Sequence, residues 1–243
     1  MAERIHLYNY LVLDIETAPC VSNYNQLSEA MQNLWKRKSL QLVSANEDFE
    51  FTFFNKSGVY AEFAKIICIG LGYFVKVKNE WQYRVKTITH HDEKKVLEEF
   101  CSIVHSFFNT KSKNFAGHNI REFDIPFLCR RCLINILELP VALKKLQSIK
   151  PWENNLIDTL QLWKFGDYKH YISLDLLATI LTIDSPKDDI DGSRVAEVYW
   201  NENNLQRIAK YCCKDIVTVA QIILRLHQFP LLRSEQIIYT NEE

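Results

Sequence analysis

The sequence predicts an α/β fold in which helices cover the faces of a sheet. Two stretches rich in apolar and β-branched residues, 11–17 and 64–74, are typical of buried strands, and the alternation in residues 81–89 predicts a third strand. Farther along, short strands alternate with helices, and the chain ends in a mainly helical part. The first three strands follow one another along the chain, which favours an antiparallel meander.

The stretch between the first two strands, residues 20–60, has a weaker pattern, with one helical-looking piece at 26–35. We interpret it as an insertion that caps the functional site. Within the second strand, Gly70 and Gly72 favour a bulge or the close approach of another part of the chain.

After the third strand, Asp92 is a suitable N-cap for a helix that runs to about residue 109. A short strand at 114–118 leads into a second helix, which begins near Phe123, and a fifth strand ends at Asp158. In the C-terminal part we expect three helices, capped by Ser173, Ser193 and Asn204 and running to Leu181, Trp200 and about His227.

Composition narrows the class of protein. The chain has 243 residues, of which 47% are hydrophobic and 24% charged, as in a globular protein with a substantial core. Six Gly and six Pro argue against long linkers, so we expect one domain over residues 1–243 with the insertion at 20–60. Seven Cys are an odd number without the spacing of a disulfide framework, which predicts a cytoplasmic location.

Charge and hydropathy argue against three further classes of protein: secreted proteins, membrane proteins and proteins that coat duplex DNA. Polar residues near the N-terminus, such as Asn9 and Asp14, interrupt the apolar core that a signal peptide needs. No stretch approaches the roughly 18 apolar residues of a membrane span, so we expect no membrane partner. The net charge of −1 argues against a protein that coats duplex DNA, but it allows an enzyme that handles one strand end through bound cations.

The first group of chemical interest lies at the end of strand 11–17. Asp14 and Glu16 are separated by one residue, so on a strand their side chains point to the same face. Adjacent carboxylates repel each other, and a hard divalent cation relieves that repulsion. The pair therefore predicts half of a metal site. For so short a motif, the alternative is that both side chains face water.

Two more polar groups occur farther along the chain. Asn119, Phe123 and Asp124 lie where the fourth predicted strand turns into the second helix. Tyr211 and Asp215 are four residues apart, so they share one face of the last helix. We expect that face to look back at the end of the first strand.

In order, Asp14-x-Glu16, Asn119-x-x-x-Phe123-Asp124 and Tyr211-x-x-x-Asp215 resemble the three motifs of the DEDD, or DnaQ-like, 3′-5′ exonucleases in their tyrosine-bearing branch. The sequence between them looks most like the stand-alone bacterial exonucleases related to the proofreading domain of family B DNA polymerases. Each motif alone is weak, but three in this order form a specific signal. The resemblance covers residues 10–226 and implies an RNase H-like fold, with a mixed five-stranded sheet flanked by helices.

The resemblance also implies an activity: metal-dependent removal of nucleoside monophosphates from the 3′ end of single-stranded DNA, or RNA. Family members use two Mg²⁺ or Mn²⁺ ions about 4 Å apart, which serve the attacking water and the leaving oxygen. By this resemblance, four catalytic acids are the metal ligands, namely Asp14, Glu16, Asp124 and Asp215. Tyr211 is the fifth catalytic residue and orients the water, because a phenol with an ordinary pKa of about 10 is a poor base.

Substrate contacts also follow from the resemblance. The partner is a nucleic acid with a single-stranded 3′ end, and the residues expected to hold its terminal nucleotide are Ile15, Thr17, Asn119, Phe123 and Tyr211. Phe123 either stacks on a base or is an ordinary core aromatic. The sequence identifies no protein partner.

Two other functions stay open. The first is a catalytically silent nucleic-acid-binding module on the same fold, which the presence of all four acids and Tyr211 argues against. The second is a hydrolase of nucleotides or other small phosphate esters, which would use the same metals. The fold alone does not choose among these functions.

Other polar residues have simpler interpretations. Cys129 and Cys132 form a C-x-x-C without a second pair, which indicates helix residues rather than a zinc site. We interpret His118 as structural, Asp158 as a helix cap and Asp175 as an acid in the first turn of a helix. Two basic clusters, 36–38 and 144–145, either contact a nucleic-acid backbone or face solvent, whereas Lys187 either approaches the site or lies in a polar loop.

Overall fold

The computed structural model describes residues 6–42, 48–110, 112–150, 153–154, 156–168, 171–184 and 190–240. Lys187 lies outside these described residues. At the centre is a sheet with the strand order β5-β4-β1-β2-β3-β6. The strands are β1 (Tyr10–Pro19), β2 (Ala64–Val77), β3 (Glu80–Thr89), β4 (Asn114–Gly117), β5 (Ile157–Asp158) and β6 (Ile237–Tyr239).

The pairing of the strands confirms the predicted meander and the mixed sheet. β1, β2 and β3 pair antiparallel, whereas β4 is parallel to β1, β5 to β4 and β6 to β3. We expected five strands, and the structure adds a sixth, β6. It has only three residues, two of them exposed, so it lacks the apolar alternation that marks a strand in the sequence.

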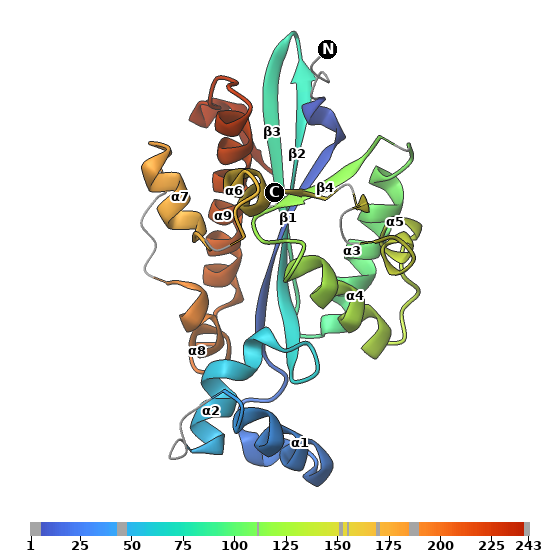
Figure 1. Cartoon of the computed structure of the whole chain (residues 1–243), viewed down its shortest axis with the longest axis vertical. Helices are drawn as coiled ribbons and strands as arrows, with labels where there is room; N and C mark the ends of the chain where they lie inside the picture. The colour runs from blue at the N-terminus through green and yellow to red at the C-terminus, as the bar shows by residue number, and fades with distance from the viewer. Residues whose placement is uncertain are drawn as a thin grey trace.

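The helices are α1 (Glu29–Ser39), α2 (Phe49–Lys56), α3 (Glu93–Phe107), α4 (Asp124–Ile134), α5 (Val141–Lys144), α6 (Thr159–Lys164), α7 (Leu174–Ile180), α8 (Val195–Trp200) and α9 (Leu205–Leu226). Figure 1 shows α9 with α6, α7 and α8 on one side of the sheet and α3, α4 and α5 on the other. None of the helices in the described part of the chain is long and apolar enough to cross a bilayer.

Three of the predicted N-caps are confirmed, because Asp92, Ser173 and Asn204 each accept a backbone N–H in the first turn of α3, α7 and α9. The predicted cap Ser193 is wrong. Asp191 accepts the Ser193 N–H and opens a 3₁₀ turn, and α8 begins only after that turn. Asp has the stronger acceptor, and it lies two residues upstream.

The two faces of β1 belong to different cores. Leu11, Leu13 and Ile15 pack in the core shared with α3 and α4. Tyr10 and Val12 point the other way and pack on α9. Asp14 and Glu16 follow Val12 in this alternation, so the two carboxylates lie on the α9 side of the sheet.

Gly70 lets α9 lie close to the sheet, as the sequence predicts for a glycine inside a strand. It pairs with Asp14 across β1 and β2. A Cβ at Gly70 would lie 2.7 Å from Cys212 Sγ and 2.7 Å from Ile216 Cγ1, both on α9. The same two strands carry a bulge, since Glu16 faces Cys68 but Thr17 faces Ile66.

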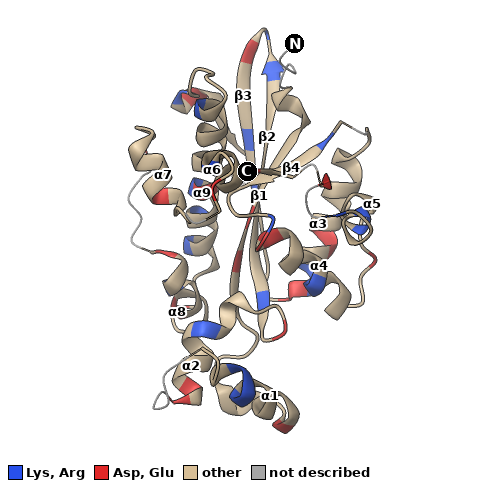
Figure 2. Cartoon of the chain, in the orientation of Figure 1, with Lys and Arg blue, Asp and Glu red and all other residues tan. Residues whose placement is uncertain are grey.

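The insertion forms a small cluster of its own at the end of the molecule that holds α1 and α2 (Figure 1). The ring of Trp35 lies edge-on to Phe53 and Phe63, with centroids 5.5 and 5.1 Å apart. The basic residues of α1 lie at this end (Figure 2), where Lys38 Nζ is 4.6 Å from the centre of the Tyr60 ring. The helix predicted at 26–35 is confirmed, but it begins at Glu29 after the cap Ser28.

Candidate active site

Asp14 and Glu16 project from β1 toward α9. Asp14 is half-buried, while Glu16 is only 7% exposed. Within the described part of the chain, the Glu16 carboxylate has no hydrogen-bond donor and no ion pair. A buried carboxylate without a donor or a cation is costly, so this position favours a bound cation.

Helix α9 brings three side chains to these carboxylates. Tyr211 and Asp215 lie one turn apart and share a side-chain hydrogen bond. Cys212, between them in sequence, is fully buried, and its Sγ lies 3.5 Å from Asp14 Oδ2. The helix packs on the sheet through an apolar stripe, which fixes the rotation at which these side chains face β1.

Asp124 reaches the same place from the first turn of α4. It is buried, and its Oδ1 accepts the backbone N–H of Ile15 at 3.0 Å. This bond joins the second predicted motif directly to the first. Burial raises the pKa of Asp124 to about 7, although the N–H groups of Asp124 and Ile15 act in the opposite direction.

The electrostatics show that the acids affect one another. Burial raises the pKa of Asp14 well above its ordinary value, and the charges of Asp124 and Asp215 raise it further. Burial also raises the pKa of Glu16, with Asp14 and Asp215 adding to the effect. The pKa of Tyr211 is raised by burial first and by the nearby acids second. The structure thus brings together the four predicted acids and Tyr211 from β1, α4 and α9.

Asn119 lies on the turn before Asp124, where its carbonyl accepts the Phe123 N–H at 3.1 Å, and its backbone is left-handed, with φ of 59°. Asn adopts this conformation more readily than most residues. Its backbone N–H donates to Asp158 Oδ1 at 2.9 Å, and the N–H of Arg121 donates to Asp158 Oδ2 at 3.1 Å. The buried Asn119 Oδ1 has no hydrogen-bond partner in the described structure, which is unusual for a buried polar atom.

The remaining predicted substrate residues have mixed environments. The Ile15 side chain is in the core, and its N–H is used by Asp124. Thr17 donates its hydroxyl to the carbonyl of Gly58 at 2.7 Å, which ties β1 to the end of the insertion. Phe123 is half-buried and lies 5.4 Å from the Phe127 ring, so the structure gives it a core contact while leaving part of its surface accessible.

The simpler interpretations of three polar residues are confirmed. His118 is structural, because its ring nitrogens lie 2.9 Å from Thr159 Oγ1 and 2.9 Å from the Ile172 carbonyl oxygen. Asp158 caps α6 through the N–H of Leu160, and Asp175 lies in the first turn of α7.

Sequence reasoning missed two cysteines of the site. Cys212 directly follows Tyr211 in the third motif, and this adjacency is a signal that the sequence contains. Cys68 faces Glu16 in the β1–β2 register and is hydrogen-bonded to Cys212. The sequence has no signal for that pairing, because it depends on the bulge and on the position of α9.

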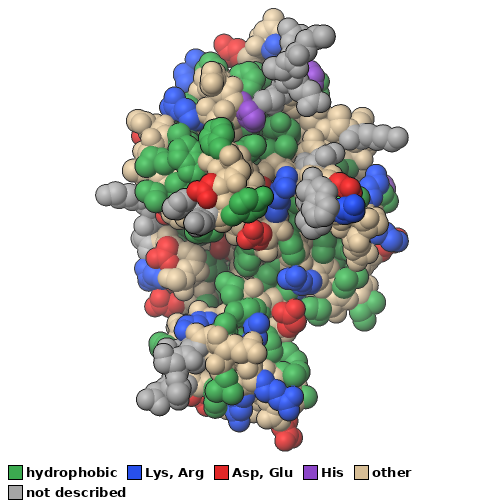
Figure 3. Space-filling view, in the orientation of Figure 1, with side chains coloured by type: hydrophobic (Ala, Val, Ile, Leu, Met, Phe, Trp, Pro, Cys, Tyr) green, Lys and Arg blue, Asp and Glu red, His purple; other side chains and the backbone are tan. Residues whose placement is uncertain are grey.

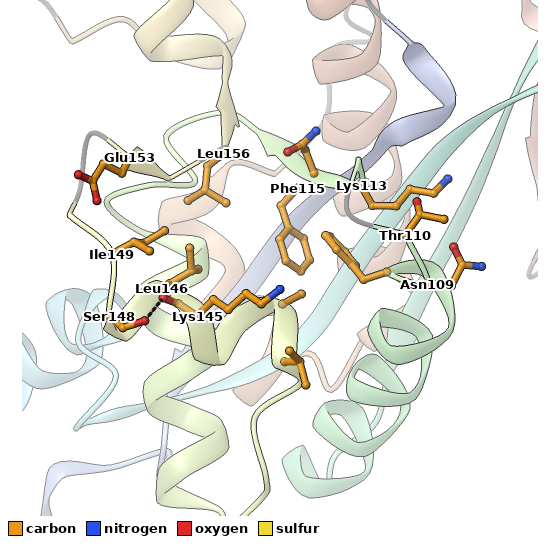
Figure 4. A pocket seen from close by; sticks show the side chains of 14 residues that line it. Asn109, Thr110, Lys113, Phe115, Lys145, Leu146, Ser148, Ile149, Glu153 and Leu156 are labelled. Atoms are coloured by element: carbon orange, nitrogen blue, oxygen red, sulfur yellow. Dashed lines mark hydrogen bonds between the residues drawn. The ribbon is translucent and has the colours of Figure 1, made fainter.

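A separate cavity of about 470 Å³ opens on the α3 and α5 side of the sheet. Figure 4 shows it between the end of α3, the start of β4 and the α5 segment, with Phe115 on its floor and Lys145 reaching across it. None of the predicted site residues lines this cavity. It therefore lies apart from the carboxylate cluster.

Comparison with known families agrees with this geometry. Residues 59–235 match a family described as a predicted 3′-5′ exonuclease related to the exonuclease domain of PolB. The match covers more than half of the 243 residues. The chain belongs to this PolB-related exonuclease family. The matched segment contains the second and third motifs and begins after Asp14 and Glu16, which the fold supplies from β1.

A solved structure with a similar fold is the family B DNA polymerase from the hyperthermophilic archaeon Pyrobaculum calidifontis, with a TM-score of 0.50 and 17% identity. The similar region covers 88% of this chain and 24% of the polymerase, so the chain spans about a quarter of that protein. The predicted RNase H-like fold and the resemblance to DnaQ-like exonucleases are confirmed, while the assignment to the tyrosine branch stays a prediction. A search of curated proteins finds no match.

Proposed function

We propose that this protein is a metal-dependent 3′-5′ exonuclease of the tyrosine branch, which releases nucleoside monophosphates from the 3′ end of single-stranded DNA. The observation that carries the proposal is the meeting of Asp14 and Glu16 with Asp124 and with the Tyr211–Asp215 pair. These groups come from three segments far apart in sequence, and the chain belongs to an exonuclease family, which supports the proposal.

The donor set fits Mg²⁺ or Mn²⁺. Both ions prefer carboxylate oxygens, and the buried Glu16 carboxylate has no other partner in the described chain. Asp14, Glu16, Asp124 and Asp215 would hold the ions. When bound, two such ions supply an ionised water and neutralise charge on the leaving oxygen.

Tyr211 has a positioning role in this proposal. Its pKa is raised by burial and by the acids around it, so the phenol stays protonated at neutral pH. A protonated phenol held by Asp215 orients a water molecule by hydrogen bonding, and it does not remove a proton. The unpartnered Oδ1 of Asn119 supports a contact between this side chain and the terminal nucleotide.

Exposed aromatic side chains support a single-stranded substrate. Hydrophobic side chains gather over α6 and α7 (Figure 3), where Phe165, Tyr168 and Tyr171 are 87%, 97% and 68% exposed. Tyr171 precedes Ile172, whose carbonyl is bound by His118, next to Asn119. Aromatic faces stack on unpaired bases of any sequence, so this surface is suited to a strand that leads away from the site.

Two wider expectations belong to the same proposal. The insertion at 20–60 caps the site of a single domain over residues 1–243, which the bond from Thr17 to Gly58 supports. The cytoplasmic location is supported by the free thiols of all seven cysteines.

The direct test is digestion of a 5′-labelled single-stranded DNA oligonucleotide with Mg²⁺, Mn²⁺ or EDTA. We expect a metal-dependent descending ladder, and a loss of at least ~100-fold in rate for Asp14→Asn, because one of the carboxylates that would hold the ions is removed. Asp175→Asn is the matched control, since it makes the same change on an exposed turn of α7.

Other outcomes distinguish the alternatives. An intact oligonucleotide that nevertheless shifts with the protein would favour a binding module without catalysis. Hydrolysis of a small phosphodiester such as bis(p-nitrophenyl) phosphate without any cleavage of oligonucleotides would favour a small-molecule phosphodiesterase. Parallel digestion of an RNA oligonucleotide of the same sequence decides the preferred nucleic acid.

A further inference from the structure

The Asp14 site contains sulfur as well as oxygen. Cys212 is fully buried, and one ligand atom from each of Asp14, Glu16 and Cys212 lies within 4.8 Å of the others. Mg²⁺ does not use a sulfur ligand, so the function proposed above gives Cys212 no part. In the metal-free structure its thiol donates hydrogen bonds to Asp14 Oδ2 at 3.5 Å and to the Asp14 carbonyl at 3.8 Å.

The spacing of these atoms suits a tetrahedral ion. Zn²⁺ binds a cysteine sulfur at about 2.3 Å and a carboxylate oxygen at about 2.0 Å, and at the tetrahedral angle these two ligands are about 3.5 Å apart. Cys212 Sγ lies 3.5 Å from Asp14 Oδ2. No change in the separation of these two atoms is needed to fit the ion.

Two further observations point to a cation of this type. Glu16 is 7% exposed, and its carboxylate has no donor or ion pair within the described chain, so one ligand is already largely buried and unpaired. Cys68 is also fully buried, faces Glu16 across the sheet and is hydrogen-bonded to Cys212. The ion would thus meet two carboxylates and one thiol directly, with a second thiol behind them.

We propose that Zn²⁺ binds at Asp14, Glu16 and Cys212, with the Cys212 sulfur as a ligand, and that it competes there with Mg²⁺ or Mn²⁺. Sulfur ligands select zinc over these harder ions, and zinc binds most sites more tightly than Mn²⁺. On binding, the Cys212 S–H bond breaks, its proton goes to water, and the sulfur lone pair forms the bond to zinc without any oxidation or reduction. Zinc would then occupy the two carboxylates of β1 and inhibit the exonuclease. This inhibition rests on the proposed function.

Cobalt(II) provides a direct spectroscopic test, because it replaces Zn²⁺ in tetrahedral sites and a cobalt–thiolate bond gives a charge-transfer band in the near ultraviolet. We expect this band when Co²⁺ is titrated into the full chain, and we expect one equivalent of Zn²⁺ to abolish it. The Cys212→Ser variant should lack the band and bind Zn²⁺ about 10–100-fold more weakly. Cys213→Ser changes the next residue of α9 and is the control, so it should keep the band and the wild-type affinity for Zn²⁺. Absence of the band in the wild type, or its survival in Cys212→Ser, would overturn the proposal.

A second measurement covers the case in which Cys212→Ser does not fold. The ¹¹³Cd resonance of the wild-type protein with one equivalent of Cd²⁺ lies far downfield for a sulfur ligand, and it lies near that of the aqueous ion for an all-oxygen site. The downfield position supports the proposal, and the all-oxygen position overturns it.

The two proposals fail in different ways. Metal-dependent cleavage by a protein that shows no sulfur signal would reject the zinc site and keep the exonuclease. A sulfur signal in a protein that cleaves no oligonucleotide would do the reverse. If both proposals hold, equimolar Zn²⁺ should inhibit cleavage in excess Mg²⁺. The Cys212→Ser variant should then need about 10-fold more zinc for the same inhibition.

Discussion

At the scale of single residues, the site depends on polar groups that the fold leaves without partners. The Glu16 carboxylate and the Asn119 amide oxygen are buried and unbonded within the described chain. Buried polar groups are nearly always hydrogen-bonded, so we interpret these two groups as positions at which a ligand would bind. Asn119 is the clearer case, because Asp158 fixes its backbone and leaves only the side chain free.

Replacing Asn119 separates its backbone role from its ligand role. Asn119→Gly keeps the left-handed conformation, whereas Asn119→Ala adds a strain of about 1 kcal/mol there. We expect Asn119→Ala to be the less stable of the two in thermal unfolding. Both variants should raise KM for the oligonucleotide about 10-fold, the usual loss of one hydrogen bond to a ligand. An unchanged KM in Asn119→Gly would show that the amide does not contact the substrate.

At the scale of the elements, α9 and α4 must be held against β1 for the acids to meet. Gly70 sets the distance between α9 and the sheet, since Cys212 and Ile216 of α9 occupy the space that a side chain at position 70 would need. The position of α4 is set by Arg131, which pairs with Glu93 of α3 at 2.5 Å and donates to the Ala61 carbonyl at 2.8 Å. Gly70 and the Arg131–Glu93 pair are both buried, so we expect substitutions at either place to be destabilising.

Gly70→Ala should move α9 away from the sheet. Its Cβ would lie 2.7 Å from Cys212 Sγ, so we expect a loss of about 1–3 kcal/mol in the free energy of unfolding. Cleavage should fall more than stability alone predicts, because Tyr211 and Asp215 move with the helix. Denaturant unfolding and single-turnover cleavage measure the two effects. Gly192→Ala is the control, since nothing lies within 4 Å of a Cβ at that position, and equal behaviour of the two variants would contradict this prediction.

Arg131→Met should destabilise the protein by about 3–5 kcal/mol, because it leaves the Glu93 carboxylate buried without its cation. The matched control is Lys86→Met, which breaks an ion pair with Glu99 whose side chains are 43% and 46% exposed and should cost less than about 1 kcal/mol. Urea unfolding of both variants provides the comparison. Similar losses would mean that the buried pair does not anchor α4.

At the scale of the whole molecule, we expect binding of a cation at the proposed site to stabilise the fold. Asp14, Glu16 and Asp124 have raised pKa values, so the folded metal-free protein binds more protons than the unfolded chain at intermediate pH. Stability from these groups is present below their ordinary pKa values and is lost as pH rises through the folded values, which for Asp124 is about 7. A bound cation removes this penalty by neutralising the carboxylates.

In EDTA, we therefore expect the wild-type protein to lose stability relative to Asp124→Asn as pH rises from about 4 to about 8. The comparison with the variant is needed because burial lowers the pKa of His118, which has the opposite dependence on pH. Thermal unfolding at several pH values measures the difference. Mn²⁺ should restore stability at high pH in the wild type. A difference between the two proteins that does not change with pH would refute the raised pKa of Asp124.

The sequence by itself determined the succession of strands β1 to β5 along the chain and the caps Asp92, Ser173 and Asn204, and it predicted the residues of three motifs. These features are local, because side-chain alternation and cap hydrogen bonds involve residues a few positions apart. The cap of α8 escaped prediction because two acceptors, Asp191 and Ser193, compete within three residues.

Only the tertiary structure decided which groups surround the carboxylates. The Ile15–Asp124 bond, the use of Asp158 to hold the Asn119 turn and the approach of Cys68 and Cys212 to Glu16 and Asp14 join residues from different elements. The register of β1 on β2, its bulge and the close packing of α9 at Gly70 set these distances. Such distances depend on how the elements pack, which local sequence patterns do not specify.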